Sequence, residues 1–268
     1  MSVEGTSFGS NRALRRRWLR ALTLVGAPQV PGASLAGSDP SASRFAPVVP
    51  GQPLSFPRDH GAHPEFRIEW WYLTGWLDTH SVQGIGPSIG VQITFFRVAT
   101  GHQRHHQSQF AARQLLFAHA ALAVPGRHRL QSAERAARTG WGLAEASESD
   151  TGIVLGDWRL QRNQDDRYIA TIVDSKLSIE LSLKANAPPL LQGDQGFSRK
   201  GPSPSQASYY YSRPRLAAEG RIRLGAEQSP RADPAWSPVR GSVWFDHEWS
   251  SELLDPDAQG WDWVGLHI

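Results

Sequence analysis

Two segments of the chain hold carboxylates beside large aromatic side chains, the combination that acid catalysis on an apolar molecule needs. The first, residues 56–76, runs from a loop into an alternating stretch. On a strand, Glu69 and Trp71 share one face, whereas Trp70 and Tyr72 share the other. A carboxylate beside indoles on an inward face loses solvation, which raises its pKa, so Glu69 is a candidate general acid. The alternative is that Glu69 hydrogen-bonds the neighbouring loop and closes one end of the fold.

The second segment, residues 241–251, places two carboxylates two positions apart. On a strand, Trp244, Asp246 and Glu248 share one face, and His247 lies on the other. Carboxylates that share a face repel each other, so one of them can remain protonated, which suits proton delivery. The alternative is that both point to solvent.

A third segment, residues 191–202, is rich in glycine and is expected to form a loop in which Asp194 and Lys200 pair. The run 208–212 follows it, and its tyrosines, Tyr210 among them, would line a rim. An ordinary structural loop is the alternative interpretation.

The histidines follow no recognised metal-ligand spacing, so no metal and no cofactor are predicted. His60 and His63 with Glu65 form one possible ligand group, and residues 102–106 hold three further histidines. The chain has no cysteine, which excludes disulfides, thiolate zinc sites and cysteine nucleophiles. Neither a serine hydrolase nor a metallohydrolase is predicted.

The bulk composition is typical of a globular protein. The 268 residues are 40% hydrophobic with a mean hydropathy of -0.42. No apolar run reaches the roughly 18–20 residues that a membrane-spanning helix needs. Eleven tryptophans against one methionine indicate either a β core padded with aromatic rings or an aromatic-lined ligand cavity.

Most of the basic character lies in the first 36 residues. The chain has 28 basic and 25 acidic residues. Residues 1–36 contain five of the arginines and one glutamate, so 23 basic and 24 acidic residues remain, a net charge of −1. A near-neutral body lacks the basic footprint of phosphate binding, so no nucleic-acid partner is predicted.

Residues 1–36 have the features of an export signal. Five arginines precede a short apolar run and small residues, and Arg16-Arg17-Trp18-Leu19-Arg20 resembles a twin-arginine motif. A periplasmic or secreted location follows from this interpretation; a disordered basic tail is the alternative. Residues 37–57, rich in Ser, Pro and Ala, are expected to be a linker.

The body of the chain shows the period-two alternation of strands. Residues 89–96 alternate clearly, and 167–184 predicts a hairpin with its turn at 174–175. Only 131–138 is expected to be helical. Further strands are expected at 67–78, 115–124, 152–160, 220–225, 241–249 and 261–268. Many strands with one apolar face require a barrel or a sandwich. Because 261–268 has no turn or cap signal after it, the chain is expected to be a fragment.

Four ordered stretches resemble the AttH family, whose members are also called lipocalin-like, predicted secreted hydrolases and carotenoid 1,2-hydratase-like. They are Asp59–Gly75 with its Glu-Trp-Trp-Tyr run, Gly193–Gly201, Ala207–Ser212, and Trp244–Glu248 followed by Gly260–Trp263. The resemblance implies a mainly β, lipocalin-like (calycin-type) antiparallel barrel or sandwich, the first of two in tandem. It divides the chain into a first domain, 58–240, and the start of a truncated second domain, 241–268.

The resemblance also implies a Tyr-x-Asp in the hydratase branch, where this chain reads Trp244-Phe245-Asp246. One hypothesis is therefore acid-catalysed addition of water to an isoprenoid C=C bond, with Asp246 as the acid and Glu69 or Glu248 as the base. The expected ligand-binding residues are His63, Trp70, Trp71, Tyr72, Tyr210, Trp244 and His247.

The alternative hypothesis is a carrier or chaperone of a hydrophobic small molecule that performs no chemistry, with possible contact to a membrane surface or a transporter. The two hypotheses differ in where the carboxylates point. Asp246 and Glu69 facing one apolar cavity would favour an enzyme, whereas carboxylates facing loops or solvent would favour a carrier.

Overall fold

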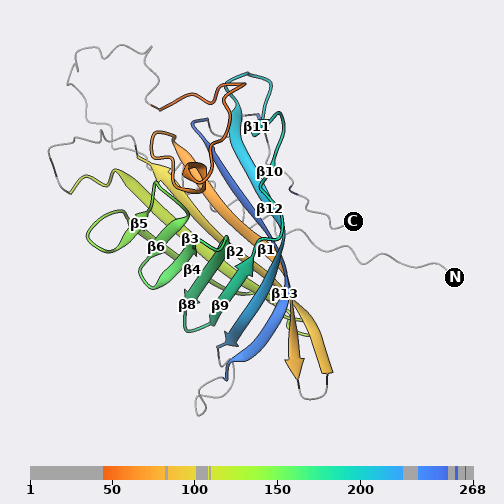
Figure 1. The fold of residues 1–268 in the computed structure, drawn as a ribbon. Helices are drawn as coiled ribbons and strands as arrows, with labels where there is room; N and C mark the ends of the chain where they lie inside the picture. Colours follow the sequence, from red (N-terminus) through yellow and green to blue (C-terminus); the bar gives the residue numbers. More distant parts are fainter. Residues whose placement is uncertain are drawn as a thin grey trace. The chain divides into compact units, whose positions relative to one another are not determined.

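The fold is a single antiparallel sheet that curls into a nearly closed barrel (Figure 1). The computed structural model describes residues 45–81, 84–100, 108, 110–225, 235–252, 257–258 and 263. Within these residues no helix is long and apolar enough to cross a membrane. One 3-10 helix, η1 (Arg58–His60), precedes the first strand. The mainly β barrel predicted from the sequence is confirmed.

Eleven strands form the barrel wall in the order β4-β3-β2-β1-β13-β12-β9-β8-β7-β6-β5. The two short strands β10 (Leu190–Leu191) and β11 (Phe197–Arg199) pair with β12 outside this path. The wall strands are β1 (Ile68–Ser81), β2 (Gly84–Ala99), β3 (Gln114–Ala123), β4 (Gln131–Arg138), β5 (Ala144–Ala146), β6 (Gly152–Leu155), β7 (Trp158–Arg162), β8 (Arg167–Val173), β9 (Leu177–Lys184), β12 (Ala207–Leu224) and β13 (Ser237–Ser250).

The two ends of the strand path, β4 and β5, are consecutive in sequence, and β4 approaches β6 and β9 from the other half of the path. Arg135 of β4 reaches across to the opposite wall, where it pairs with Asp157 and donates to the carbonyl of Val173 at 3.3 Å. Its guanidinium also lies 5.1 Å from the ring centre of Trp158. These contacts link the two ends of the sheet, so the barrel is nearly closed.

The barrel interior is filled by the alternating inward side chains of the strands. On β1 these are Glu69, Trp71, Leu73 and Leu77, all buried, while the intervening residues lie on the outer face. The largest fully buried rings include Trp71, Trp158, Trp249, Tyr168 and Tyr211. The described part of the interior is therefore a packed core.

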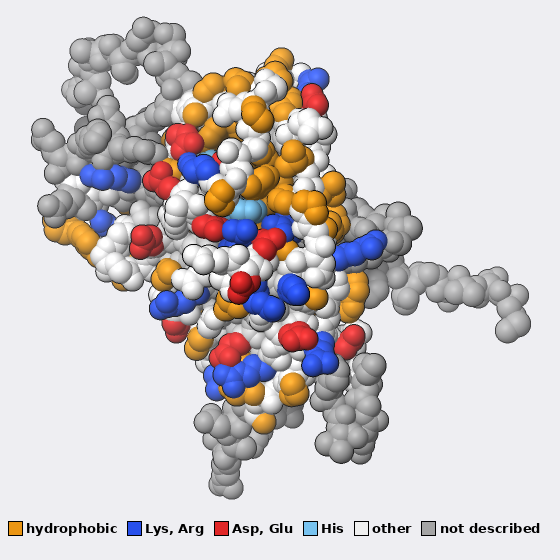
Figure 2. All heavy atoms as spheres, in the orientation of Figure 1, with side chains coloured by type: hydrophobic (Ala, Val, Ile, Leu, Met, Phe, Trp, Pro, Cys, Tyr) orange, Lys and Arg blue, Asp and Glu red, His pale blue; other side chains and the backbone are white. Residues whose placement is uncertain are grey.

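The outer surface carries both signs of charge. On the face shown in Figure 2, acidic and basic side chains lie intermixed and form no patch of one sign. Among the described residues, Arg221–Glu180 and Arg240–Glu219 are examples of exposed ion pairs.

Two expectations from the sequence are wrong. Residues 131–138 form strand β4 and not a helix: Gln131 and Ala133 face inward, Ser132 and Glu134 outward, and small alanines hide this alternation in the sequence. Residues 152–160 do not form one strand. They form the β6–β7 hairpin, which turns at Gly156 with φ +62.

The expected domain boundary at residue 241 falls inside β13, which pairs with β1 on one side and β12 on the other. Residues 241–250 thus lie in the same sheet as the strands before them. The 167–184 hairpin is confirmed as β8 and β9. The predicted leader at 1–36, residues 37–44 of the linker, and all of the expected strand 261–268 except Trp263 lie outside the described residues.

Close packing of β1 against β13 depends on Gly75. A Cβ at this position would lie 2.1 Å from the carbonyl oxygen of Ser242 and 2.8 Å from the Cα of Val243. Both are backbone atoms of the paired strand, so neither can move alone.

We expect Gly75→Ala to destabilise the protein by about 1–3 kcal/mol, because it forces the two central strands apart. Urea unfolding followed by circular dichroism measures the change. Thr74→Ala, at the next position on the outer face of the same strand, is the control and should cost less. Equal stability of Gly75→Ala and the wild type would contradict the close approach.

Candidate functional site

Strand β13 carries the candidate site residues on two opposite faces. His247 pairs in register with Trp71 of β1 and Tyr211 of β12, and it points into the barrel. Asp246 pairs with Tyr72 and Ser212 and points outward. The predicted division of this segment into two faces is confirmed, and it places two separate polar clusters on either side of the sheet.

The outer-face site is centred on Asp246, whose side chain is buried although it lies outside the barrel. Its Oδ1 accepts hydrogen bonds from Ser212 Oγ at 2.5 Å and from Trp244 Nε1 at 2.7 Å. The ring of Trp263 lies 6.2 Å from that of Trp244 and 5.5 Å from that of Tyr72. Asp246 is thus a carboxyl group surrounded by aromatic rings.

Glu248 is the second buried carboxylate of this face. Its Oε1 accepts from Ser208 Oγ at 2.5 Å and pairs with Lys200 Nζ at 2.8 Å. Lys200 also lies 4.8 Å from the ring centre of Tyr210. The expected Lys200–Asp194 pair is therefore replaced by a pair with Glu248, which ties the 191–202 loop to β13.

Burial dominates the electrostatics of the outer-face site. It raises the pKa of Asp246 even though Ser212 and Trp244 donate to the carboxylate. It also raises the pKa of Glu248, where Lys200 opposes the shift and the nearby Asp246 adds to it. The expectation that both carboxylates point to solvent is wrong, and the expectation of a carboxyl group held closer to neutrality is supported.

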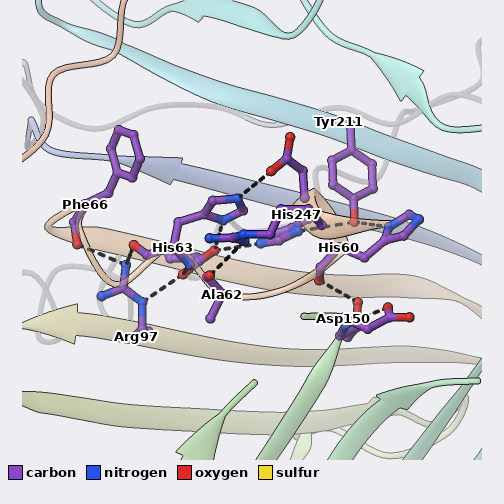
Figure 3. Close-up of polar contacts among 12 residues, drawn as sticks. His60, Ala62, His63, Phe66, Arg97, Asp150, Tyr211 and His247 are labelled. Atoms are coloured by element: carbon purple, nitrogen blue, oxygen red, sulfur yellow. Dashed lines mark hydrogen bonds and ion pairs between the residues drawn. The ribbon is translucent and has the colours of Figure 1, made fainter. Parts of the chain in front are cut away.

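The inner cluster is built around Glu69, which is 0% exposed. Its Oε1 accepts from His63 Nδ1 at 2.7 Å and from His247 Nε2 at 2.9 Å. Its Oε2 accepts from Arg97 Nε at 2.7 Å and from the backbone N–H of His63 at 2.9 Å. Arg97 in turn donates to the carbonyls of His63 and Phe66 (Figure 3). The Glu69 carboxylate on β1 is therefore hydrogen-bonded to β2, to β13 and to the loop that contains His63.

A chain of hydrogen bonds extends from this cluster along the barrel interior (Figure 3). His247 Nδ1 lies 3.2 Å from Tyr211 Oη, which lies 2.8 Å from His60 Nδ1. On the other side, His63 Nε2 lies 3.1 Å from Asp59 Oδ1. The ring of His63 stacks on Trp249 at 3.7 Å.

The charges of the inner cluster differ from the sequence expectation. Burial alone would raise the pKa of Glu69, but Arg97 and His63 outweigh it and hold this pKa well below its usual range. These partners favour the anionic form of Glu69, which does not suit the role of general acid expected from the sequence. The alternative, a glutamate that binds the neighbouring loop and closes the barrel end, is what the structure shows.

The histidines of the cluster take different charge states. Burial lowers the pKa of His247 to about 4 and that of His60 to about 3. For His63 burial acts in the same direction, but Glu69 and Asp59 outweigh it and raise its pKa. Near neutral pH, His247 and His60 are neutral.

A small cavity of about 220 Å³ adjoins the inner cluster at the barrel end where β1 begins. Its lining includes Asp59 and His63 on the polar side and Phe66, Tyr209 and Trp249 on the aromatic side.

The predicted site residues thus divide into two groups. Asp246, Glu248, Trp244, Tyr210, Tyr72 and Trp70 lie on the outer face, whereas Glu69, His63, His247 and Trp71 lie inside. Asp246 and Glu69 lie on opposite faces of the sheet, an arrangement that favours Glu248 over Glu69 as the partner of Asp246. Ser212 and Arg97 were not predicted as site residues, and Tyr211, expected at a rim, lies inside the barrel. The alternation of residues along 89–97 and 208–212 predicts which side of the sheet each of these side chains faces. No sequence motif indicates that they take part in a site.

A Gly-x-Ser-x-Gly pattern at residues 86–90 lies within β2 and not at a strand-to-helix turn. Its serine, Ser88, is exposed and donates to Asp78 at 2.5 Å. It therefore lacks the setting of a nucleophile elbow.

The fold and the two clusters define an antiparallel β-barrel with a carboxyl site on its outer face and a buried ion cluster inside. A family model described as AttH-like matches residues 47–268. The chain therefore belongs to the AttH-like family, and the resemblance seen in the sequence is confirmed.

Two solved structures are similar to this chain. One, from Nitrosomonas europaea and assigned to AttH, is 44% identical with a TM-score of 0.68, over 80% of this chain and 61% of that one. The other, kievitone hydratase from Nectria haematococca, is 9% identical with a TM-score of 0.47, over 80% and 59%. The chain spans less than two thirds of either structure's length. No curated protein sequence matches it.

Replacing Arg97 should strongly destabilise the protein. Arg97→Met leaves the Glu69 carboxylate buried with less compensation, a change that typically costs about 3–5 kcal/mol. Urea unfolding measures the loss. Arg221→Met removes an arginine from an exposed pair and should leave stability unchanged. Comparable losses in the two variants would show that Arg97 does not hold the cluster.

Acidification should destabilise the fold through the buried neutral histidines. An unfolded histidine takes up a proton near pH 6.5, whereas folded His60 and His247 do so only at about 3 and about 4. The unfolded chain therefore binds more protons below about pH 6.5, and stability falls as the pH falls. Urea unfolding between about pH 7 and about pH 4.5 should show a shallower decline for His60→Gln than for the wild type. Identical slopes would refute this assignment.

Proposed function

We propose that this protein binds a hydrophobic isoprenoid or lipid at the outer-face site and that Asp246 protonates a C=C bond of the ligand. One observation supports the proposal above the others. Asp246 is a buried carboxyl group with a raised pKa among the rings of Tyr72, Tyr210, Trp244 and Trp263. The AttH-like family includes the hydratase-like proteins that the sequence resembles.

The chemistry of hydration requires an acid that is neutral near its working pH. Burial supplies this for Asp246, because the desolvated carboxylate is disfavoured relative to its protonated form. Proton transfer to the alkene leaves a carbocation on the more substituted carbon. The π faces of Trp244 and Trp263 would stabilise that cation.

A base must then accept a proton from the attacking water. Glu248 is the suitable group, because it lies on the same face two residues from Asp246. Lys200, at 2.8 Å, favours its anionic form against the effect of burial. Glu69 is unsuited to this role, since it is on the other side of the sheet.

The hydratase branch resembled by the sequence has Tyr-x-Asp where this chain has Trp244-Phe245-Asp246. Trp244 Nε1 donates to Asp246 Oδ1. A tyrosine at this position would place its hydroxyl at a different distance from the carboxyl group and would be a more acidic donor than the indole N–H. We therefore propose the isoprenoid class as substrate and not a carotenoid in particular.

The second candidate function is a carrier that binds the same ligand without reaction. The separation of Asp246 from Glu69 favours it, because the two carboxylates do not face one cavity. For either function we propose an exported protein acting in the periplasm or outside the cell, in contact with a membrane surface or transporter that supplies the ligand.

Asp246→Asn should abolish hydration and leave ligand affinity nearly unchanged, because the amide keeps the shape but cannot donate the proton. The full chain is incubated with lycopene or squalene in ¹⁸O-labelled water, and mass spectrometry detects the labelled alcohol. Asp194→Asn, in the neighbouring loop, is the control and should retain turnover.

Three outcomes are informative. Turnover by Asp246→Asn equal to that of the wild type removes Asp246 as the acid. Tight binding of lycopene or squalene without any labelled product favours the carrier. Native mass spectrometry of protein purified from its own membrane fraction identifies a co-purifying lipid, and its absence together with no binding contradicts both functions.

A further inference from the structure

We propose that His63, Glu69 and His247 form a buried transition-metal site of the zinc type inside the barrel. One ligand atom from each residue lies within 4.8 Å of the other two. Glu69 Oε1 is 2.7 Å from His63 Nδ1 and 2.9 Å from His247 Nε2. A metal of this class lies about 2.1 Å from each ligand atom, so the three side chains would exchange their mutual hydrogen bonds for bonds to the ion.

The residues around this cluster match the outer shell of a metal site. A ligating histidine usually uses its second ring nitrogen for a hydrogen bond, often with a carboxylate, and a ligating carboxylate is itself hydrogen-bonded. Here His63 Nε2 contacts Asp59, His247 Nδ1 contacts Tyr211, and Glu69 Oε2 accepts from Arg97. All three ligands are therefore oriented by a second partner.

Two buried donors beside the cluster point to a further oxygen ligand. Arg97 Nη1 and Trp71 Nε1 are buried and have no hydrogen-bond partner among the described residues. The Trp71 ring stacks on His247 at 4.9 Å, and Arg97 holds Glu69. Buried donors are normally satisfied by protein or by ordered water. A water or hydroxide on the metal's fourth position would supply the missing acceptor.

The donor set selects the class of metal. Two imidazoles and one carboxylate, with no thiolate, suit Zn²⁺ and also Co²⁺. The 220 Å³ cavity is lined by His63, one of the three ligands, and by Asp59, its hydrogen-bond partner. No metal is predicted from the sequence because Glu69 and His247 are 178 residues apart and share no spacing motif.

This site is on the opposite side of β13 from Asp246, so the proposal does not depend on the hydratase function. The test is isothermal titration of the EDTA-treated full chain with Zn²⁺, and with Co²⁺ followed by visible absorption. We expect one Zn²⁺ per chain and a Co²⁺ spectrum of four-coordinate type. No binding, or a Co²⁺ spectrum of six-coordinate hydrated type, would overturn the proposal.

Variants assign the binding to these residues. His247→Gln should abolish it, and Asp59→Asn should weaken affinity by about 10–100-fold. Asp59 is not a ligand, so Asp59→Asn leaves the three ligands in place. If His247→Gln does not fold, the affinity of Asp59→Asn for Zn²⁺ tests the site instead. His119→Gln, which changes a half-buried histidine on β3, is the control and should bind normally.

The three histidines at 102–106 are a competing source of Zn²⁺ binding. A triple variant, H102Q/H105Q/H106Q, should retain one Zn²⁺ per chain. Loss of binding in this variant, or unchanged affinity in both His247→Gln and Asp59→Asn, would refute the inner site.

Discussion

The Glu69 carboxylate is the interaction on which the arrangement of the barrel depends. It lies on β1 and accepts hydrogen bonds from β2, from β13 and from the loop after η1. A buried anion is tolerated only when its partners compensate the lost hydration. Its partners must therefore stay in place, and this requirement fixes the register of three central strands and the position of the loop that closes the barrel end.

The same anchoring determines what the outer face presents. His247 is held to Glu69 and Tyr211 inside the barrel. Because successive strand residues point to opposite sides, its neighbours Asp246 and Glu248 must point outward. Lys200 of the loop 191–202 pairs with Glu248, and aromatic side chains surround Asp246, so both carboxylates are buried without entering the barrel. Two clusters of different charge thus share one strand, with an anion inside and raised-pKa carboxyl groups outside.

Much of the fold was predictable because period-two alternation is a local signal. It identified β1, β3, β8, β9 and part of β13, and it assigned the two faces of residues 241–249 correctly. It failed at β4, where alanines carry no apolar contrast, and at the β6–β7 turn. The charge state of Glu69 was not predictable, because Arg97 and His247 reach it through strand pairing over 28 and 178 residues. Family resemblance supplied the fold class but not which carboxylates share a face.

The central position of β13 has a consequence for how the chain folds during synthesis. Its pairing with β1 joins residues 68–79 to residues 239–250, and its pairing with β12 joins the other half of the wall. Until a ribosome has made residue 250, β1 and β12 each keep an unpaired edge, and such edges promote association between chains. Contacts this distant in sequence also form slowly. Before β13 is made, the nascent chain can form only two separate open sheets. At this stage its unpaired strand edges are most exposed to aggregation and to binding by chaperones.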